Sequence, residues 1–354
     1  MIIDLKTYGL TPDFERAAAG KPHAKLGRVV NQQRNLYRVL TATGELKAQL
    51  SGKFRHVATT QTEFPTVGDW VLLTALTSDR AQIQQVLPRR SVLARGSVHQ
   101  AGQGQLIAAN LDTVFICTSL NEEFNVRRLE RYLTLAWESR ATPVIVLTKM
   151  DLCRDLATKM AALETVSVGV ETIICSVKEP ASLAPLHQYT TPGRTVAFIG
   201  SSGVGKSTLI NALLGRTELV TRTIRADDDK GRHTTTARQL LQLPTGGLVI
   251  DTPGMRELQL YAGNLDQTFG DVAQLATRCR FNDCSHQTEP GCAVRAAVER
   301  GELDPQRVVS YQKLQREMSY QDLNARQLEQ AKIERMFGGK RAMQQVVRRA
   351  KKRR

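Results

Sequence analysis

The sequence GSSGVGKS, at Gly200–Ser207, constrains the fold of this chain more than any other stretch. It fits the pattern G-x-x-x-x-G-K-S in full, follows the apolar run TVAFI and precedes the helix-forming run STLINALLG. Glycines in such a loop let backbone N–H groups turn inward around phosphate oxygens, and the N-terminus of the following helix adds positive potential. The pattern therefore predicts a strand, a phosphate-binding loop and a helix, in that order.

Within this loop, Lys206 is predicted to reach the β- and γ-phosphates of a nucleotide, and the Ser207 hydroxyl is predicted to bind Mg²⁺. Further along, Asp251-Thr-Pro-Gly254 ends the apolar run GLVI. An Asp there can hold Mg²⁺ through water, and the Gly N–H can contact the γ-phosphate. The expected nucleotide contacts in these two motifs are Gly200, Ser201, Ser202, Gly203, Val204, Gly205, Lys206, Ser207, Thr208, Asp251 and Gly254.

The stretch Thr148-Lys149-Met150-Asp151 indicates which base is bound. A carboxylate at Asp151 can accept hydrogen bonds from N1–H and the 2-amino group of guanine, whereas adenine offers neither donor. The stem of Lys149 can cover the base. Asn is usual where Thr148 stands, so we expect this shorter side chain to lose one connection to the phosphate loop and to give moderate affinity. Cys175-Ser176-Val177 is expected to supply a backbone contact to guanine O6.

The order of these motifs is unusual, because Gly200 lies 49 residues after Asp151 instead of well before it. Short apolar runs alternate with helical segments from about residue 106 to 258, which predicts a doubly wound parallel sheet. We therefore expect a circularly permuted α/β P-loop GTPase domain at 106–258, since such a permutation can preserve a compact fold. The chain leaving Asp251–Gly254 then runs directly into the C-terminal part.

Hydrolysis requires a residue that orients water. Met255 follows the D-x-x-G glycine, at a place where many GTPases have Gln, and it cannot hydrogen-bond usefully to water. His233, within GRHTTT at 231–236, is the candidate catalytic residue, and a plain surface histidine is the alternative. Thr235, ahead of Thr234, is expected to bind Mg²⁺ in the GTP state. Without Gln or an evident arginine finger, intrinsic turnover should be slow.

Five short β-rich runs lie within residues 25–105, after an N-terminal extension at 1–24. They predict a small OB-type β-barrel, a common oligonucleotide-binding platform, although any small β-domain would fit. Tyr37, Phe54 and Trp70 are available for stacking on bases, with Trp70 better interpreted as a core residue.

A Cys/His cluster follows at Cys279, Cys284, His286 and Cys292. Three thiolates and one imidazole form a closed tetrahedral set for one structural Zn²⁺, whereas incidental cysteines in a loop are the alternative. We assign 259–330 to a helical zinc-binding domain and 331–354 to a basic tail.

The charge of the chain points to a polyanionic partner. Of 354 residues, 49 are Lys or Arg and 34 are Asp or Glu, which gives +15. Lys21–Thr60 holds eight basic residues and one acid, and 331–354 holds ten and one. These basic ends favour RNA, although a solvated surface is the simpler alternative. No secretory signal or membrane-spanning run is evident, so we expect a cytoplasmic monomer that is not bound to a membrane.

The β-rich domain, the permuted motifs, GRHTTT and the Cys/His spacing together make the chain resemble the RsgA family, also known as YjeQ or YloQ, the GTPases that depend on the small ribosomal subunit. The resemblance covers roughly residues 25–320. It implies a late maturation factor for the small (30S) ribosomal subunit that binds ribosomal RNA. It also implies slow GTP hydrolysis stimulated by that subunit, with the catalytic role at the matching His233.

Two alternatives stay open. The first is a GTPase that acts on another RNA or ribonucleoprotein, because the barrel, the Cys/His unit and the tail would serve equally well. The second is a non-catalytic RNA-binding protein with a degenerate nucleotide site. The presence of Lys206, Ser207, Asp251 and Asp151 opposes this second reading.

Overall fold

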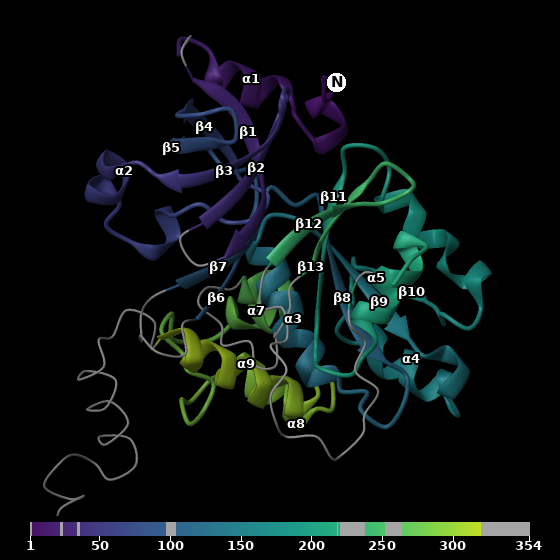
Figure 1. The fold of residues 1–354 in the computed structure, drawn as a ribbon. Helices are drawn as coiled ribbons and strands as arrows, with labels where there is room; N and C mark the ends of the chain where they lie inside the picture. The colour runs from purple at the N-terminus through teal and green to yellow at the C-terminus, as the bar shows by residue number, and fades with distance from the viewer. Residues whose placement is uncertain are drawn as a thin grey trace, which may run out of the picture.

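The computed structural model describes residues 2–21, 24–33, 36–96, 104–217, 219, 238–251 and 264–319. Figure 1 shows a β-barrel at one end, a nucleotide-domain sheet in the middle and a group of helices below it. The expected combination of a five-stranded barrel, an α/β domain and a C-terminal Cys/His unit is confirmed. Three expected site residues, His233, Thr235 and Gly254, lie outside the described residues, as do Met255 and the basic tail.

The barrel contains five strands whose inward-facing apolar residues alternate with polar ones. Neighbouring strands follow the order β1-β2-β3-β5-β4, and β1 also pairs with β4, which closes the ring. All pairings are antiparallel except β3 with β5. This is the strand order of an OB-type barrel. The strands are β1 (Lys25–Gln33), β2 (Leu36–Thr41), β3 (Gly44–Leu50), β4 (Trp70–Ala75) and β5 (Arg80–Val86), with α2 (Gly52–Val57) and η2 (Gln61–Glu63) between β3 and β4.

The aromatic residues of the barrel serve its core. Trp70 is completely buried, as interpreted from the sequence, and its ring centroid lies 5.7 Å from that of Phe14. Tyr37 is also buried, so the expectation that it can stack on bases was wrong. Phe14 belongs to α1 (Pro12–Ala18), which follows η1 (Leu5–Tyr8). The N-terminal segment therefore packs as part of the barrel.

The nucleotide-domain sheet has the order β10-β9-β8-β11-β13-β12, in which only β12 is antiparallel. Alternate residues of each strand enter different cores. Ile116 and Ile145 face the core that includes α3, while Phe115 and Val144 face the core that includes α5. Helices thus cover both faces of the sheet. The elements are β8 (Thr113–Ser119), α3 (Val126–Glu138), β9 (Thr142–Thr148), η3 (Met150–Leu152), α4 (Leu156–Glu164), β10 (Glu171–Ile174), η4 (Pro180–Tyr189), β11 (Thr195–Gly200), α5 (Lys206–Leu214), β12 (Arg238–Gln242) and β13 (Leu248–Asp251).

Two features join the barrel to this sheet. Strand β1 pairs with β12 through Asn31 and Gln32, so the barrel and the nucleotide domain share backbone hydrogen bonds. Arg28 of β1 is completely buried, and burial lowers the pKa of its guanidinium to about 10. This side chain donates to the Gly68 carbonyl at 3.2 Å and to the Thr195 hydroxyl at 3.0 Å, one on each side of the junction. Because a buried guanidinium needs all its partners, these bonds resist separation of the two domains.

The hairpin β6 (Val92–Gly96) and β7 (Gly104–Ala109) forms a separate two-stranded sheet between the barrel and β8. Strand β6 and the first two residues of β7 fall within the range 25–105 that we assigned to the barrel, but the hairpin contributes no strand to the ring.

The C-terminal helices pack on the face of the sheet that carries α3. These helices are α6 (Leu265–Thr268), α7 (Gly270–Ala276), α8 (Ala293–Glu299) and α9 (Pro305–Ser319). Glu130 of α3 is completely buried and accepts a hydrogen bond of 2.8 Å from Arg307 of α9. Arg307 also donates to Asp271 at 2.6 Å and to the Thr268 carbonyl at 2.9 Å. A buried charge network therefore fixes this unit against α3.

Candidate nucleotide and metal sites

The phosphate loop begins where β11 meets the end of β8. Gly200 has a φ of 143°, and a Cβ there would stand 2.2 Å from the Cys117 carbonyl oxygen, so only glycine fits. Gly205, with a φ of 96°, is the last residue before α5. Left-handed backbone at these positions turns the loop around a central space. The strand, loop and helix predicted from the sequence are thus all present.

Lys206 lies at the centre of this loop. Its ammonium group donates to the carbonyl oxygens of Gly200 at 2.7 Å and Ser201 at 2.6 Å. Burial lowers its pKa, while Cys117 and Asp251 act in the opposite direction. Asp251 ends β13, the strand next to β11. A half-buried cation whose hydrogen bonds go to neutral carbonyls is well suited to bind phosphate.

The carboxylate of Asp151 faces a second loop. It accepts a hydrogen bond of 2.6 Å from the Ser176 hydroxyl and lies 2.8 Å from the Lys178 ammonium. These partners, with Lys178 the larger influence, hold the pKa of Asp151 below its usual value, so the group is ionised at neutral pH. The sequence indicated backbone contacts from residues 175–177 but neither side-chain partner. Lys178 directly follows residues 175–177 in the chain, and this position was the one sequence feature that could have indicated its contact with Asp151.

A pocket of about 210 Å³ lies beside this carboxylate. It opens between the end of β9, the loop after β10 and the start of α5, and is therefore next to the phosphate loop. Its size and mainly apolar wall suit a planar base with one edge against Asp151. Met150 lies beside it, with its N–H donating to the Cys175 carbonyl at 3.2 Å. The lining residues are Thr148, Lys149, Asp151, Leu152, Cys175, Ser176, Val177, Lys178, Gly205, Thr208 and Leu209.

Thr148 keeps a connection between the base pocket and the phosphate loop. Its hydroxyl donates to the Val204 carbonyl at 2.6 Å. Lys149, whose φ is 57°, adds a second connection because its ammonium group donates to the Gly203 carbonyl at 2.7 Å. The expectation was that the shorter Thr148 would lose one connection to the phosphate loop; its hydroxyl keeps one, because β9 ends close to the loop.

Two side chains of α3 also contact the phosphate loop, and sequence reasoning did not find them. Arg128 donates to the Ser201 hydroxyl at 2.9 Å, and the Tyr132 hydroxyl lies 3.2 Å from the same oxygen. Ser201 is therefore held from outside the loop.

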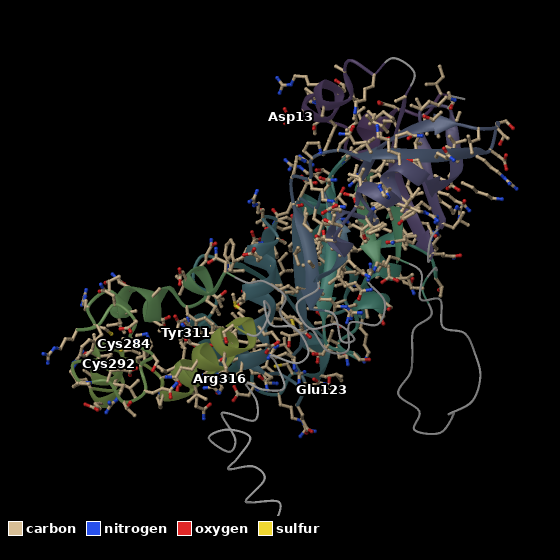
Figure 2. All side chains as sticks on the ribbon, turned by 90° about the vertical axis from the view of Figure 1, so that its left-hand side faces the viewer. Asp13, Glu123, Cys284, Cys292, Tyr311 and Arg316 are labelled. Carbon is tan, nitrogen blue, oxygen red and sulfur yellow. The ribbon has the colours of Figure 1, made fainter. Side chains whose placement is uncertain are left out.

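The four predicted metal ligands meet in the C-terminal unit. Cys279, Cys284, His286 and Cys292 place one ligand atom each within 4.8 Å of one another. Cys279 Sγ lies 3.9 Å from Cys292 Sγ, and His286 Nδ1 lies 3.7 Å and 3.4 Å from these two sulfurs. Figure 2 shows Cys284 and Cys292 at the end of the molecule opposite the barrel, which carries Asp13. The cluster can hold a metal ion and is remote from the barrel.

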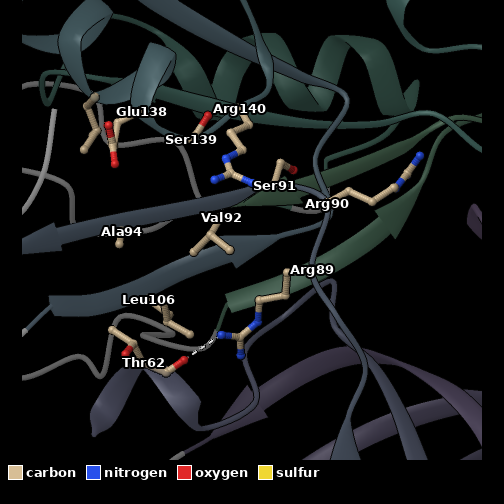
Figure 3. Close-up of a pocket in the computed structure, with 11 residues that line it drawn as sticks. Thr62, Arg89, Arg90, Ser91, Val92, Ala94, Leu106, Glu138, Ser139 and Arg140 are labelled. Atoms are coloured by element: carbon tan, nitrogen blue, oxygen red, sulfur yellow. Dashed lines mark hydrogen bonds between the residues drawn. The ribbon is translucent and has the colours of Figure 1, made fainter. Parts of the chain in front are cut away.

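The chain also has a larger pocket, of about 380 Å³, between η2, β6, β7 and the end of α3 (Figure 3). Arg89 lines it, but this side chain is already paired with Asp69 at 2.8 Å and donates to the Phe64 carbonyl at 2.8 Å. Asp69 is completely buried, so the pair is part of the structure of the barrel. No phosphate-binding loop borders this pocket, and we place the nucleotide site at the phosphate loop instead.

The fold and the phosphate loop define a P-loop nucleotide-binding protein in which the pocket segment at 148–151 precedes the phosphate loop. A family model described as RsgA GTPase matches residues 86–261. A second model, ABC transporter, matches residues 183–350, a range that includes the same loop. Because that loop is shared by many NTPases, the second match carries little beyond it. Among the described helices, none combines the length and apolar character needed to cross a bilayer.

Similar proteins point the same way. The chain is 60% identical to "Small ribosomal subunit biogenesis GTPase RsgA 2" of Lactiplantibacillus plantarum, with 99% of both chains covered. It is 46% identical to "Small ribosomal subunit biogenesis GTPase RsgA" of Opitutus terrae, with 83% of each covered. The crystal structure of YjeQ from Thermotoga maritima matches with a TM-score of 0.61 at 29% identity, covering 84% of this chain and 99% of that one. That of YloQ, a circularly permuted GTPase, matches with a TM-score of 0.59 at 26% identity, covering 85% and 97%.

The chain belongs to the RsgA GTPase family, and it is a GTPase.

Proposed function

We propose that this chain hydrolyses GTP during the maturation of the small (30S) ribosomal subunit and that the subunit stimulates the reaction. The observation that carries the proposal is the base pocket, in which an ionised Asp151 lies near the phosphate loop. Thr148 connects the pocket to that loop through its hydrogen bond to Val204. The two relatives compared above are small ribosomal subunit biogenesis GTPases by name, and they indicate the target. The place of action is then the cytoplasm, and a single copy suffices because both ends of the site come from one chain.

The proposed contacts follow the geometry. Asp151 binds the guanine edge once Ser176 and Lys178 yield, Lys149 covers the base, and the loop from Gly200 to Thr208 surrounds the phosphates. Ser207 and Asp251 fit Mg²⁺, because the hydroxyl at the start of α5 and the carboxylate at the end of β13 offer the oxygen ligands that this ion prefers. When bound, Mg²⁺ neutralises charge on the β- and γ-phosphates. We assign Thr235 to the same ion, Gly254 to the γ-phosphate and His233 to the attacking water.

We further propose that the Cys/His cluster holds one structural Zn²⁺. Zinc–ligand bonds of about 2.0–2.3 Å in a tetrahedron place sulfurs about 3.8 Å apart and sulfur and nitrogen about 3.6 Å apart. The separations of 3.9, 3.7 and 3.4 Å among Cys279, Cys292 and His286 fit these values. His286 would bind through Nδ1. A closed set of four ligands leaves no open position, so the ion would organise a segment with few core residues of its own.

Charge and connectivity suggest how the subunit is recognised. The barrel and the tail at 331–354 carry the excess of cations that binds ribosomal RNA through phosphates. β13 carries Asp251, and the chain continues from there toward the C-terminal helices, so the nucleotide state should set which conformation binds. Linkage requires reciprocity: if GTP tightens subunit binding, the subunit tightens GTP binding equally.

The test measures GTP turnover with small subunits, with large subunits and alone. We expect stimulation by the small subunit and much less by the large one. Sedimentation with a non-hydrolysable GTP analogue should show binding at least about tenfold tighter than with GDP, and binding should fall steeply with salt. Equal stimulation by both subunits, or by neither, would favour another RNA target.

A further inference from the structure

The guanidinium of Arg128 lies at the edge of the phosphate loop with no acidic partner among the described residues. It is exposed, and within the described part of the chain its side chain donates one hydrogen bond, of 2.9 Å, to the Ser201 hydroxyl. Arginines next to it on α3 are engaged elsewhere: Arg127 with Asp304 and Arg131 with Glu317. A guanidinium carries five N–H donors, so most of those on Arg128 have no protein partner in the described part of the chain.

The start of α3 fixes where Arg128 can act. The Asn125 side chain accepts a hydrogen bond of 3.0 Å from the Arg128 backbone N–H, which caps the helix. Arg128 therefore projects from the first turn, and one turn later Tyr132 approaches the same Ser201 oxygen at 3.2 Å. Tyr132 is buried. Ser201 thus keeps a partner if Arg128 turns away from it.

The position relative to Lys206 indicates what Arg128 would turn toward. Ser201 binds Arg128 through its hydroxyl and Lys206 through its carbonyl, at 2.6 Å. The P-loop lysine is the group that reaches the β- and γ-phosphates. Only Ser201 therefore lies between Arg128 and the side of the loop where these phosphates bind. Arginine binds phosphate oxygens in a fork that lysine cannot reproduce.

We propose that Arg128 contacts the γ-phosphate of bound GTP and so supplies an arginine to the site from within the chain. The proposal rests on the GTPase activity and extends it. Water attacks the γ-phosphorus, the bond to the β–γ bridging oxygen breaks, and GDP and phosphate result. Arg128 transfers no proton. Its charge stabilises the oxygens on which negative charge accumulates.

The experiment compares Arg128→Ala with wild type in the absence of ribosomal subunits. We expect Arg128→Ala to lower the affinity for a non-hydrolysable GTP analogue by about tenfold while GDP affinity stays within about twofold, because GDP has no γ-phosphate. Intrinsic kcat should fall by about tenfold or more, and Arg128→Lys should restore only part of either loss. Arg55→Ala, which removes an exposed arginine of α2, is the matched control and should change neither quantity.

Tyr132→Phe separates a phosphate contact from a structural effect on Ser201. It removes the other hydrogen bond to Ser201 and should leave the preference for the GTP analogue over GDP unchanged. The proposal is overturned if Tyr132→Phe reproduces the loss, if Arg128→Ala lowers GDP and analogue affinity equally, or if it changes nothing. Because no subunit is present, each of these results leaves the proposed role in subunit maturation intact.

Discussion

The Thr148 hydroxyl donates a hydrogen bond of 2.6 Å to the carbonyl of Val204, which connects the end of β9 to the middle of the phosphate loop. Both residues are buried, so water cannot replace this bond easily. The segment to which we assign base recognition is thereby held in place relative to the phosphate loop. This arrangement predicts that guanine and phosphate are bound as one unit.

Thr148→Val keeps the shape of the side chain but leaves the Val204 carbonyl without its donor. An unsatisfied buried carbonyl costs about 1–3 kcal/mol, so GTP and GDP affinities should both fall by about tenfold. Thr148→Ser, which keeps the hydroxyl, is the matched control. Titration with fluorescent GDP and GTP measures the effect, and a change in only one nucleotide would contradict the role given to Thr148.

Asp151→Asn should weaken GTP binding by about 1.5–3 kcal/mol, because hydrogen bonds to a charged acceptor are lost. The variant should gain affinity for xanthosine triphosphate, whose additional carbonyl can accept from an amide. Competition between the two nucleotides provides the measurement. An unchanged preference for GTP would remove Asp151 from the base site.

The lowered pKa of Asp151 adds a dependence on pH. The charged form is the one held by Lys178 and Ser176, so its contribution is present above the usual carboxyl pKa and is lost only as pH falls through the lower, folded-state value. The affinity of the wild type for GTP should therefore not fall between pH 7 and 5 through protonation of Asp151.

Arg307→Met should loosen the C-terminal unit, because the buried Glu130 would lose its ion pair with Arg307 and keep the one with Arg127. Removing one member of a buried pair costs about 3–5 kcal/mol. Thermal melting and limited proteolysis within 264–319 report on this interface. The double variant Glu130→Gln, Arg307→Met should recover part of the loss, and a single variant as stable as wild type would show that the network contributes little.

One zinc ion per chain is expected at the Cys/His cluster. Metal analysis of the purified protein checks the stoichiometry, and a Cys284→Ser, Cys292→Ser variant should contain none. Cys153→Ser, outside the cluster, is the control. Full zinc content in the double variant would rule out these ligands.

His233→Ala should leave GTP binding nearly intact and lower subunit-stimulated hydrolysis by about 10²-fold or more, as expected for a positioned catalytic group. Single-turnover assays beside nucleotide titrations separate the two quantities. If binding and turnover fell equally, His233 would be a nucleotide-binding residue instead.

The parts of this fold that could be predicted are those in which a local pattern carries the chemistry. The glycines around Lys206 and the spacing of Cys279, Cys284, His286 and Cys292 depend on short stretches of chain. Contacts across the fold were not accessible in the same way. Arg128 reaches Ser201 across 73 positions, and nothing in the sequence near either residue indicates that α3 points its first turn at the loop.

Aromatic residues show a second limit. Tyr37 looked suitable for stacking because it occurs in a basic, β-rich region, but alternation along β2 turns it into the barrel core. The face on which a strand residue lies depends on register, and a shift of one residue reverses it. Thr148 illustrates a third limit, because the distance between its hydroxyl and the Val204 carbonyl is known only once the phosphate loop is packed against β9.

The short ladder between β1 and β12 has a consequence for synthesis of the chain. Asn31 pairs with Gln239, so this edge of β1 stays without its partner until about 200 further residues have been made. At about 5–20 residues per second, that delay lasts roughly 10–40 seconds. An unpaired strand edge is a template for pairing with other chains. The nascent barrel therefore exposes this strand edge until the nucleotide domain has been synthesised and covers it.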